Sequence, residues 1–154
     1  MIDVDVDEVA WAALSEPEMC VMNAAKATFA KLDHDVSDKA VAIVLACDED
    51  AAELNQQWRG KPGATNVLSF PAAGNIPLQP GEPRHLGDII LAAGVIASEA
   101  VTQEKSLADH TSHLVVHGIL HILGYDHTDE DEAEAMESLE IAILNDLGIA
   151  NPYL

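Results

Sequence analysis

The chain has 154 residues, 49% of them hydrophobic, and carries 27 acidic against 7 Lys and Arg side chains, a formal net charge of −20. This length suits one domain with a hydrophobic core and is short for two, so we expect a single domain spanning 1–154. The charge argues against a protein that coats nucleic acid through a broad basic face. A small positive cleft remains compatible with it.

No apolar run reaches the roughly 18 to 20 residues needed to cross a bilayer. The first residues, MIDVDVDEVAWAAL, hold aspartates where a secretory signal needs positive charge. We therefore expect no membrane association and a cytoplasmic location. Cys20 and Cys47 lie far apart beside apolar neighbours, which favours reduced core thiols without a chemical role.

The first third of the chain predicts two strands and two helices. Alternation of apolar and acidic residues in IDVDVD indicates a strand over 2–7 with one solvated face. In SEPE, Ser15 offers an N-cap, followed by a first-turn proline and a glutamate, so we expect a helix over 16–32. The run AVAIVLAC predicts a buried central strand over 40–47, and a short helix over 50–58 follows before GKPG.

Two further strands, over 66–70 and 87–92, flank the proline-rich loop PAAGNIPLQPGEPR. Three helices then follow in series, over 93–104, 107–123 and 129–147. The order of elements indicates an α+β fold, a mixed sheet of about four strands packed with helices.

The ends of these last helices carry local signals. Ser106 and Asp109 have capping-box spacing at the start of the middle helix, and Gly124 is placed to end it in a left-handed cap. The carboxylates of TDEDE favour the positive end of the next helix dipole, and Gly148 ends that helix.

The stretch HGILHILGYDH contains three histidines, His117, His121 and His127. On a helix, the first two lie one turn apart on the same face, so both imidazoles can reach one ion. Gly124 ends the helix and lets the chain reverse, which brings His127 back over the helix end. Three histidines without a fourth protein ligand describe an open zinc site, the kind more often catalytic than structural. Imidazoles also bind nickel and iron.

A histidine-rich helix can instead be a hydrogen-bonded packing face. Five of the seven histidines lie within 110–127, and His110 and His113 share the helical face of the candidate ligands. The spacing H-x3-H-x5-H, followed through a glycine stop, favours the metal interpretation. We expect His113 to pack beside the site, and we assign no role to His110, His34 or His85, the last a weak candidate beside the long loop.

The spacing coincides with a metalloprotease pattern in which a glutamate follows the first histidine. Here that residue is Gly118, which cannot accept a proton, and Met136 falls inside the last predicted helix, so no Met-turn is evident. The peptidase mechanism therefore lacks its base. Hydrolysis remains possible because zinc lowers the pKa of its bound water to about 7.

The acidic run that follows, DEDEAEAMESLE, is best explained as the cap and solvated face of the last helix. The predicted buried stripe of that helix is Ala133, Met136, Leu139, Ile143, Leu144 and Leu147. Asp126 stands apart as a neighbour able to orient a ligand imidazole.

Three blocks, LNQQWRGKPGATNVLSFP (54–71), LGDI (86–89) and HLVVHGILHILGYDH (113–127), closely resemble the bacterial YbeY family of endoribonucleases, also described as rRNA maturation factors. The resemblance implies metal-dependent cleavage of single-stranded RNA, with zinc on the histidines matching His117, His121 and His127. It further implies an arginine in the cleft at Arg59. The implied roles are ribosomal RNA maturation, including 16S rRNA 3′-end processing, and ribosome quality control, with a ribosomal partner and no DNA substrate.

The sequence departs from the family after the arginine, where an acidic residue and Pro-Thr are common and KPGATN stands here. Arg59 itself is intact, and its guanidinium suits phosphate oxygens. Without the resemblance, an exposed helix-end arginine paired with one of the many acids explains Arg59 equally well. Two alternatives to the nuclease stay open: a zinc hydrolase of another bond, and a non-catalytic ribosome-associated factor with a structural metal.

Overall fold

A computed structural model describes residues 1–33, 37–72 and 77–154. His34 and part of the predicted loop after residue 70 lie outside these ranges. Within them the chain forms β1 (Ile2–Val6), α1 (Pro17–Lys31), β2 (Lys39–Ala46), α2 (Asp48–Arg59), β3 (Val67–Pro71), β4 (Arg84–Ala92), α3 (Ala93–Thr102), α4 (Leu107–Ile122) and α5 (Glu130–Asp146).

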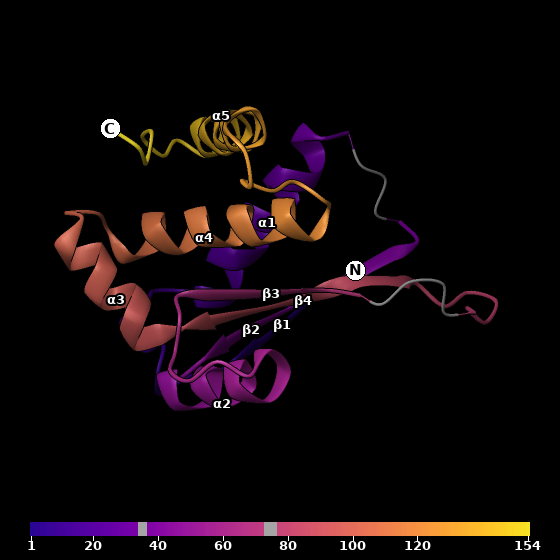
Figure 1. The fold of residues 1–154 in the computed structure, drawn as a ribbon, viewed down its shortest axis with the longest axis horizontal. Helices are drawn as coiled ribbons and strands as arrows, with labels where there is room; N and C mark the ends of the chain where they lie inside the picture. The colour runs from indigo at the N-terminus through magenta and orange to yellow at the C-terminus, as the bar shows by residue number, and fades with distance from the viewer. Residues whose placement is uncertain (34–36, 73–76) are drawn as a thin grey trace.

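The strands form one mixed sheet in the order β1-β2-β4-β3. β1, β2 and β4 run parallel, and β3 is the antiparallel edge strand beside β4. Helices cover both faces, because a parallel centre such as β2 must be buried on both sides. α1 and α4 lie on one face and α2 on the other (Figure 1). The structure is therefore the predicted single α+β domain.

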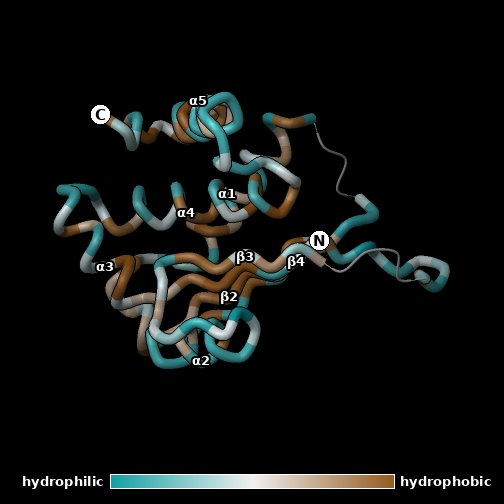
Figure 2. The backbone as a smooth tube through the Cα atoms, viewed as in Figure 1, coloured by the Kyte–Doolittle hydropathy of each residue, from teal (hydrophilic) through white to brown (hydrophobic). Residues whose placement is uncertain are grey.

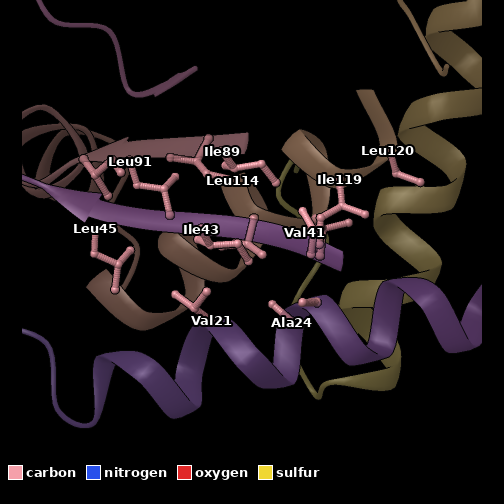
Figure 3. Close-up of a cluster of buried hydrophobic side chains, with 14 of the residues drawn as sticks. Val21, Ala24, Val41, Ile43, Leu45, Ile89, Leu91, Leu114, Ile119 and Leu120 are labelled. Carbon is pink, nitrogen blue, oxygen red and sulfur yellow. The ribbon is translucent and has the colours of Figure 1, made fainter. Parts of the chain in front are cut away.

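Strand alternation divides the core into two clusters. On β2, Val41, Ile43 and Leu45 face α1 and α4, whereas Ala46 faces α2. Figure 3 shows Val21 of α1 directed at the first of these faces. The strands are the most continuously hydrophobic part of the backbone, while α2 is largely hydrophilic and α5 has both hydrophilic and hydrophobic residues (Figure 2). The larger cluster lies between the sheet and α4, so α4 is anchored along its length.

α4 is the central helix of the domain. It contacts the sheet, α1 and α3, and α5 lies against it on the side away from the sheet (Figure 1). Its buried hydrophobic residues are Leu114, Val115, Val116, Ile119 and Leu120. Side chains that α4 and α5 direct at each other therefore meet away from the sheet.

Gly118 packs closely against the sheet. A Cβ atom at this position would lie 3.2 Å from both Ile89 Cγ2 and Ser69 Oγ. Ser69 Oγ also donates a hydrogen bond to the Gly118 carbonyl at 3.4 Å. Position 118 thus faces β3 and β4, and a glutamate there would collide with the sheet.

Most boundaries agree with the sequence, and two differences have clear causes. Ser15 does not cap α1: the N-cap is Glu16, with φ 47° and no side-chain cap bond. Pro17 excludes its preceding residue from the right-handed helical region, so the helix begins at the proline itself. β4 begins at Arg84 rather than 87, because pairing with β2 continues through a register shift at Ala40 and Val41.

The predicted helix stops are confirmed. Gly124 and Gly148 adopt positive φ values of 103° and 77°. Asp109 N–H donates to Ser106 Oγ at 3.1 Å, which confirms the cap of α4. In the described part of the chain, no helix combines the length and hydropathy needed to span a membrane.

Candidate metal centre

The turn after α4 brings two of the three candidate ligands together. α4 ends at Ile122 with Leu123 as its C-cap, Gly124 N–H donates to the His121 carbonyl at 3.1 Å, and the chain reverses. The His127 ring then lies beside His117, with ring centroids 5.7 Å apart at 80°. The predicted return of His127 is therefore present, and His121 lies one helical turn beyond His117 on the same helix.

The Nδ1 atoms of two of these histidines contact carboxylates. His117 Nδ1 lies 2.6 Å from Glu140 Oε1, and His127 Nδ1 lies 3.4 Å from Asp126 Oδ1. Asp126 therefore lies beside an imidazole, but the hydrogen bond that its Oδ1 accepts, at 2.7 Å, comes from the backbone N–H of His127. A carboxylate on one ring nitrogen leaves the other, Nε2, as the available ligand atom, the usual arrangement behind a metal-bound histidine. His121 Nδ1 is buried and has no hydrogen-bond partner among the described residues.

The donor set therefore fits a divalent ion that prefers nitrogen ligands, such as zinc. The ligand atoms of the three histidines do not all lie within 4.8 Å of one another. Within the described ranges, the only three potential ligands whose atoms all lie within 4.8 Å of one another are Asp7, Cys47 and Asp50. Binding of one ion by all three histidines would require them to move closer together, and the His127 side chain, which is 59% exposed, has space to move.

The group of Asp7, Cys47 and Asp50 lies where β2 leads into α2, and local capping accounts for its contacts. Asp7 Oδ1 accepts from Ala10 N–H at 3.1 Å, and Cys47 Sγ accepts from Asp50 N–H at 3.5 Å as the N-cap of α2. Both cysteines are free thiols, as predicted, but Cys47 lies half-buried at a helix start and not in the core. Cys20 is half-buried too, with Sγ 3.4 Å from Ser112 Oγ.

Glu140 is the residue of the centre that the sequence interpretation missed. It belongs to the acidic run assigned to the cap and solvated face of α5, yet it is fully buried. Its position carried a usable signal: it lies four residues after Met136 and four before Leu144, in register with the buried stripe. An acid on an apolar stripe indicates a buried partner, which here is His117 of α4.

Three groups share the Glu140 carboxylate. Besides His117, His113 Nε2 lies 3.4 Å from Oε2, and the Tyr153 hydroxyl donates to Oε2. Burial raises the pKa of Glu140, but the hydrogen bonds from His113, His117 and Tyr153 outweigh it and lower the pKa to about 2. Burial, and then the Glu140 carboxylate, raise the pKa of Tyr153, so the phenol keeps its proton and donates. His113 thus packs beside the site, as predicted.

Arg59 ends α2 and reaches the edge strand β3. Its Nη2 donates to the Ser69 carbonyl at 3.0 Å, and its guanidinium lies 5.3 Å from the Phe70 ring centroid. No carboxylate of the described residues is within ion-pair distance of Arg59, so an ion pair does not explain its position. Ser69 of β3 therefore contacts both Arg59, through its carbonyl, and α4, through the hydrogen bond from its hydroxyl to the Gly118 carbonyl. Gly118 is the residue after His117.

The other described histidines lie apart from this centre. His110 is buried, and its Nε2 lies 2.9 Å from Glu99 Oε1, which also accepts from Asn66 Nδ2 at 3.1 Å. That network ties β3, α3 and α4 together. His85 is exposed and contacts Asp88 at 3.2 Å. After Arg59 comes the segment KPGATN, which differs from the family pattern. Asn55 Nδ2 holds it by donating to the Gly63 carbonyl at 2.8 Å.

Known proteins resemble the chain over nearly its whole length. The sequence model of the family described as Endoribonuclease YbeY matches residues 6–148. Proteins named Endoribonuclease YbeY from Maricaulis maris and Azorhizobium caulinodans are each 46% identical, covering 99% of this chain and 91% and 95% of their own lengths. One from Agrobacterium fabrum is 51% identical over 73% of this chain and 67% of its own.

A solution structure from Thermotoga maritima shares the fold. It superposes with a TM-score of 0.61 at 20% identity, over 96% of this chain and 92% of its own. The likeness in fold agrees with the match in sequence. The chain belongs to the endoribonuclease YbeY family.

Proposed function

We propose that residues 1–154 form one metal-dependent hydrolase domain, a zinc-dependent endoribonuclease that cuts single-stranded RNA. It acts in ribosomal RNA maturation, including 16S rRNA 3′-end processing, and in ribosome quality control in the cytoplasm. The observation that carries the proposal is the pair His117 and His127, side by side over the buried Glu140. Membership of the family supplies the RNA substrate.

His117, His121 and His127 are the residues that hold the ion, with nickel or iron as the alternatives to zinc. When bound, zinc supplies hydroxide near neutral pH and a Lewis acid for a phosphate oxygen. Within the chain, Glu140 keeps the His117 ring oriented through Nδ1. Gly118 contributes packing only, since its Cα faces the sheet. A peptidase base is therefore missing for a structural reason, which supports a nuclease over a protease.

Arg59 binds the scissile phosphate. The carbonyl of Ser69 and the ring of Phe70 hold the guanidinium in one orientation. A planar, permanently charged fork of donors suits two phosphate oxygens and stabilises the negative charge that grows during cleavage. Arg59 is thus a catalytic residue of the proposed enzyme.

A hollow beside Arg59 suits unpaired bases. Trp58, which is 67% exposed, and Phe70 line it together with Arg84 and His85. The Trp58 and Phe70 rings are 6.3 Å apart, inclined at 50°. Aromatic rings stack on the faces of unstacked bases, whereas paired bases are not available to them. This arrangement supports preference for a single strand.

The net charge of −20 points to a substrate delivered by a partner. A chain this acidic attracts phosphate weakly outside a local cleft, so few ionic contacts form and binding depends little on salt. The partner we propose is the ribosome or a ribosomal protein. A steep fall of RNA affinity with salt, or tight binding to any single strand, would contradict this part.

The test measures cleavage of single-stranded RNA and metal content in the same sample, for wild type and His121→Ala. We expect metal-loaded wild type to cleave and the variant to lose both metal and cleavage while remaining folded. Equal cleavage by both proteins would indicate a contaminating nuclease and contradict the proposal. If the variant unfolds, and wild type also unfolds when its metal is removed, the ion has a structural role.

A further inference from the structure

The chain after α5 turns back onto α4 beside the metal centre. Gly148 makes the turn with a φ of 77°, and Ile149 N–H donates to the Leu144 carbonyl at 2.8 Å. The Pro152 carbonyl accepts from Lys105 Nζ at 2.9 Å. The final segment, residues 149–154, is therefore docked at both of its ends, and we call it the C-terminal tail.

Tyr153 is the tail residue that reaches the centre. Its ring lies edge-on against His113, with centroids 5.5 Å apart at 86°. Its hydroxyl donates to Glu140 Oε2, while Glu140 Oε1 faces His117 Nδ1. The two oxygens of the Glu140 carboxylate therefore contact different groups: Oε2 contacts Tyr153 of the tail, and Oε1 contacts the proposed ligand His117.

We propose that Tyr153 and Glu140 are positioning residues of the metal centre: the docked tail fixes the Glu140 carboxylate, which fixes the ring of His117 for the ion. The inference rests on the proposed function only in taking His117 as a ligand. It assigns the C-terminal tail a part in assembling the centre.

The geometry explains why two residues are needed. A fully buried carboxylate held only by His117 could rotate about its own side chain, and the His117 ring would follow it. Tyr153 removes that freedom by holding the second oxygen, and His113 contacts the same oxygen at 3.4 Å. Replacing a residue that orients a ligand typically lowers metal affinity by about 10- to 100-fold.

A substitution at Tyr153 can remove the hydroxyl without removing the ring. The residue is 47% exposed, and Tyr153→Phe keeps the ring on His113 while removing only the hydroxyl. Glu140→Gln keeps the shape and one acceptor oxygen but loses the charge. Glu134→Gln, at an exposed position of the same helix, removes the same charge without touching the centre.

The experiment titrates metal-free full-length protein with Zn²⁺ in competition with a chromophoric chelator. We expect Glu140→Gln to weaken Zn²⁺ binding by about 10- to 100-fold. Tyr153→Phe should weaken it by a smaller factor, and Glu134→Gln should leave it unchanged. Because Tyr153 acts through Glu140, adding Tyr153→Phe to Glu140→Gln should cause no further loss. The visible spectrum of the Co²⁺-loaded protein should change in Glu140→Gln, a signature that a general loss of packing would not give.

Wild-type affinity in a folded Glu140→Gln or Tyr153→Phe variant would overturn the inference, as would full additivity of the two substitutions. If Glu140→Gln does not fold, the Tyr153→Phe titration decides alone. A wild type that binds zinc as expected, with the expected losses, but cleaves no RNA would refute the proposed function and leave this inference standing. A wild type without measurable Zn²⁺ affinity would refute both.

Discussion

The two ends of α4 each carry a histidine facing a carboxylate, and they differ in what surrounds the pair. Toward the N-terminal end, the His110 side chain is 4% exposed and contacts Glu99. Toward the C-terminal end, the His117 side chain is 28% exposed, contacts the buried Glu140 and has His127 beside it. The His110 ring is enclosed by protein, whereas the His117 ring is partly open to a ligand.

The difference shows how to separate a structural histidine from a candidate ligand. A hydrogen bond to a carboxylate does not distinguish them, since both histidines have one. Partial exposure does, because an open metal site needs access from solvent, and the His117 side chain is 28% exposed against 4% for His110. A neighbouring imidazole does not, since the His113 ring lies 6.4 Å from that of His110. The exposure of the two carboxylates is opposite to that of their histidines: Glu140 is 1% exposed, whereas Glu99 is 32% exposed. The protein thus buries the acid at the candidate site and the histidine at the structural one.

The largest expected effect comes from removing the most exposed of the three proposed ligands, with His127→Ala. We expect Zn²⁺ affinity to fall by more than about 100-fold, because even residues behind ligands typically cost 10- to 100-fold. The side chain is 59% exposed, so the melting temperature of the metal-free protein should stay within a few degrees of wild type. Chelator competition and thermal melts measure the two quantities. Unchanged affinity would remove His127 from the centre.

The next prediction concerns Arg59, which lies at the edge of the sheet. Arg59→Glu should lower RNA cleavage by about 100-fold, the scale for losing one group that stabilises transition-state charge. Metal content should not change, because Arg59 contacts Ser69 and Phe70 rather than a candidate ligand. Single-turnover cleavage with metal analysis provides the measurement, and Lys61→Glu two residues away serves as the matched charge control. Normal cleavage by Arg59→Glu would contradict the phosphate-binding role.

Acid unfolding tests the contacts of the Glu140 carboxylate. The pKa of Glu140 falls from 4.5 to about 2 on folding, so its contribution is full above about 4.5 and is lost as the pH drops through 2. A difference of this size corresponds to about 3 kcal/mol. Denaturant unfolding of metal-free protein between pH 5 and 2 should therefore show a wild-type advantage over Glu140→Gln that disappears toward pH 2. A constant gap across this range would contradict the lowered pKa.

The smallest effect is expected between the two ends of α4, at Gly118. Gly118→Ala places a Cβ 3.2 Å from Ile89 and Ser69, so it should destabilise the protein by about 1 to 2 kcal/mol despite alanine's better helix propensity. Zn²⁺ affinity should change little. Chemical denaturation measures the first and chelator competition the second. Stabilisation by Gly118→Ala would show that the sheet yields at this contact.

The features predicted correctly from the sequence are local ones. The apolar run at β2, the Ser106 cap and the Gly124 stop each depend on neighbouring residues, so the strand, the helix and the return of His127 followed from pattern alone. The residues missed depend on tertiary contact. Glu140 was assigned to the solvated face because its partner is 23 residues away on α4. Tyr153 carried no pattern at all, since the tail docks through contacts that no periodicity records.

The most direct test of the central claim compares His117→Ala with His110→Ala in one series, measuring Zn²⁺ affinity, RNA cleavage and unfolding free energy. We predict that His117→Ala loses metal and cleavage while staying folded, with a loss of unfolding free energy because the buried Glu140 carboxylate loses its contact at 2.6 Å. His110→Ala should lose about 2 to 3 kcal/mol of stability, because it leaves an enclosed cavity and removes one hydrogen bond to Glu99, and it should keep wild-type metal affinity. Retained zinc and cleavage in His117→Ala, or their loss in a folded His110→Ala, would contradict the assignment of the site to the C-terminal end of α4.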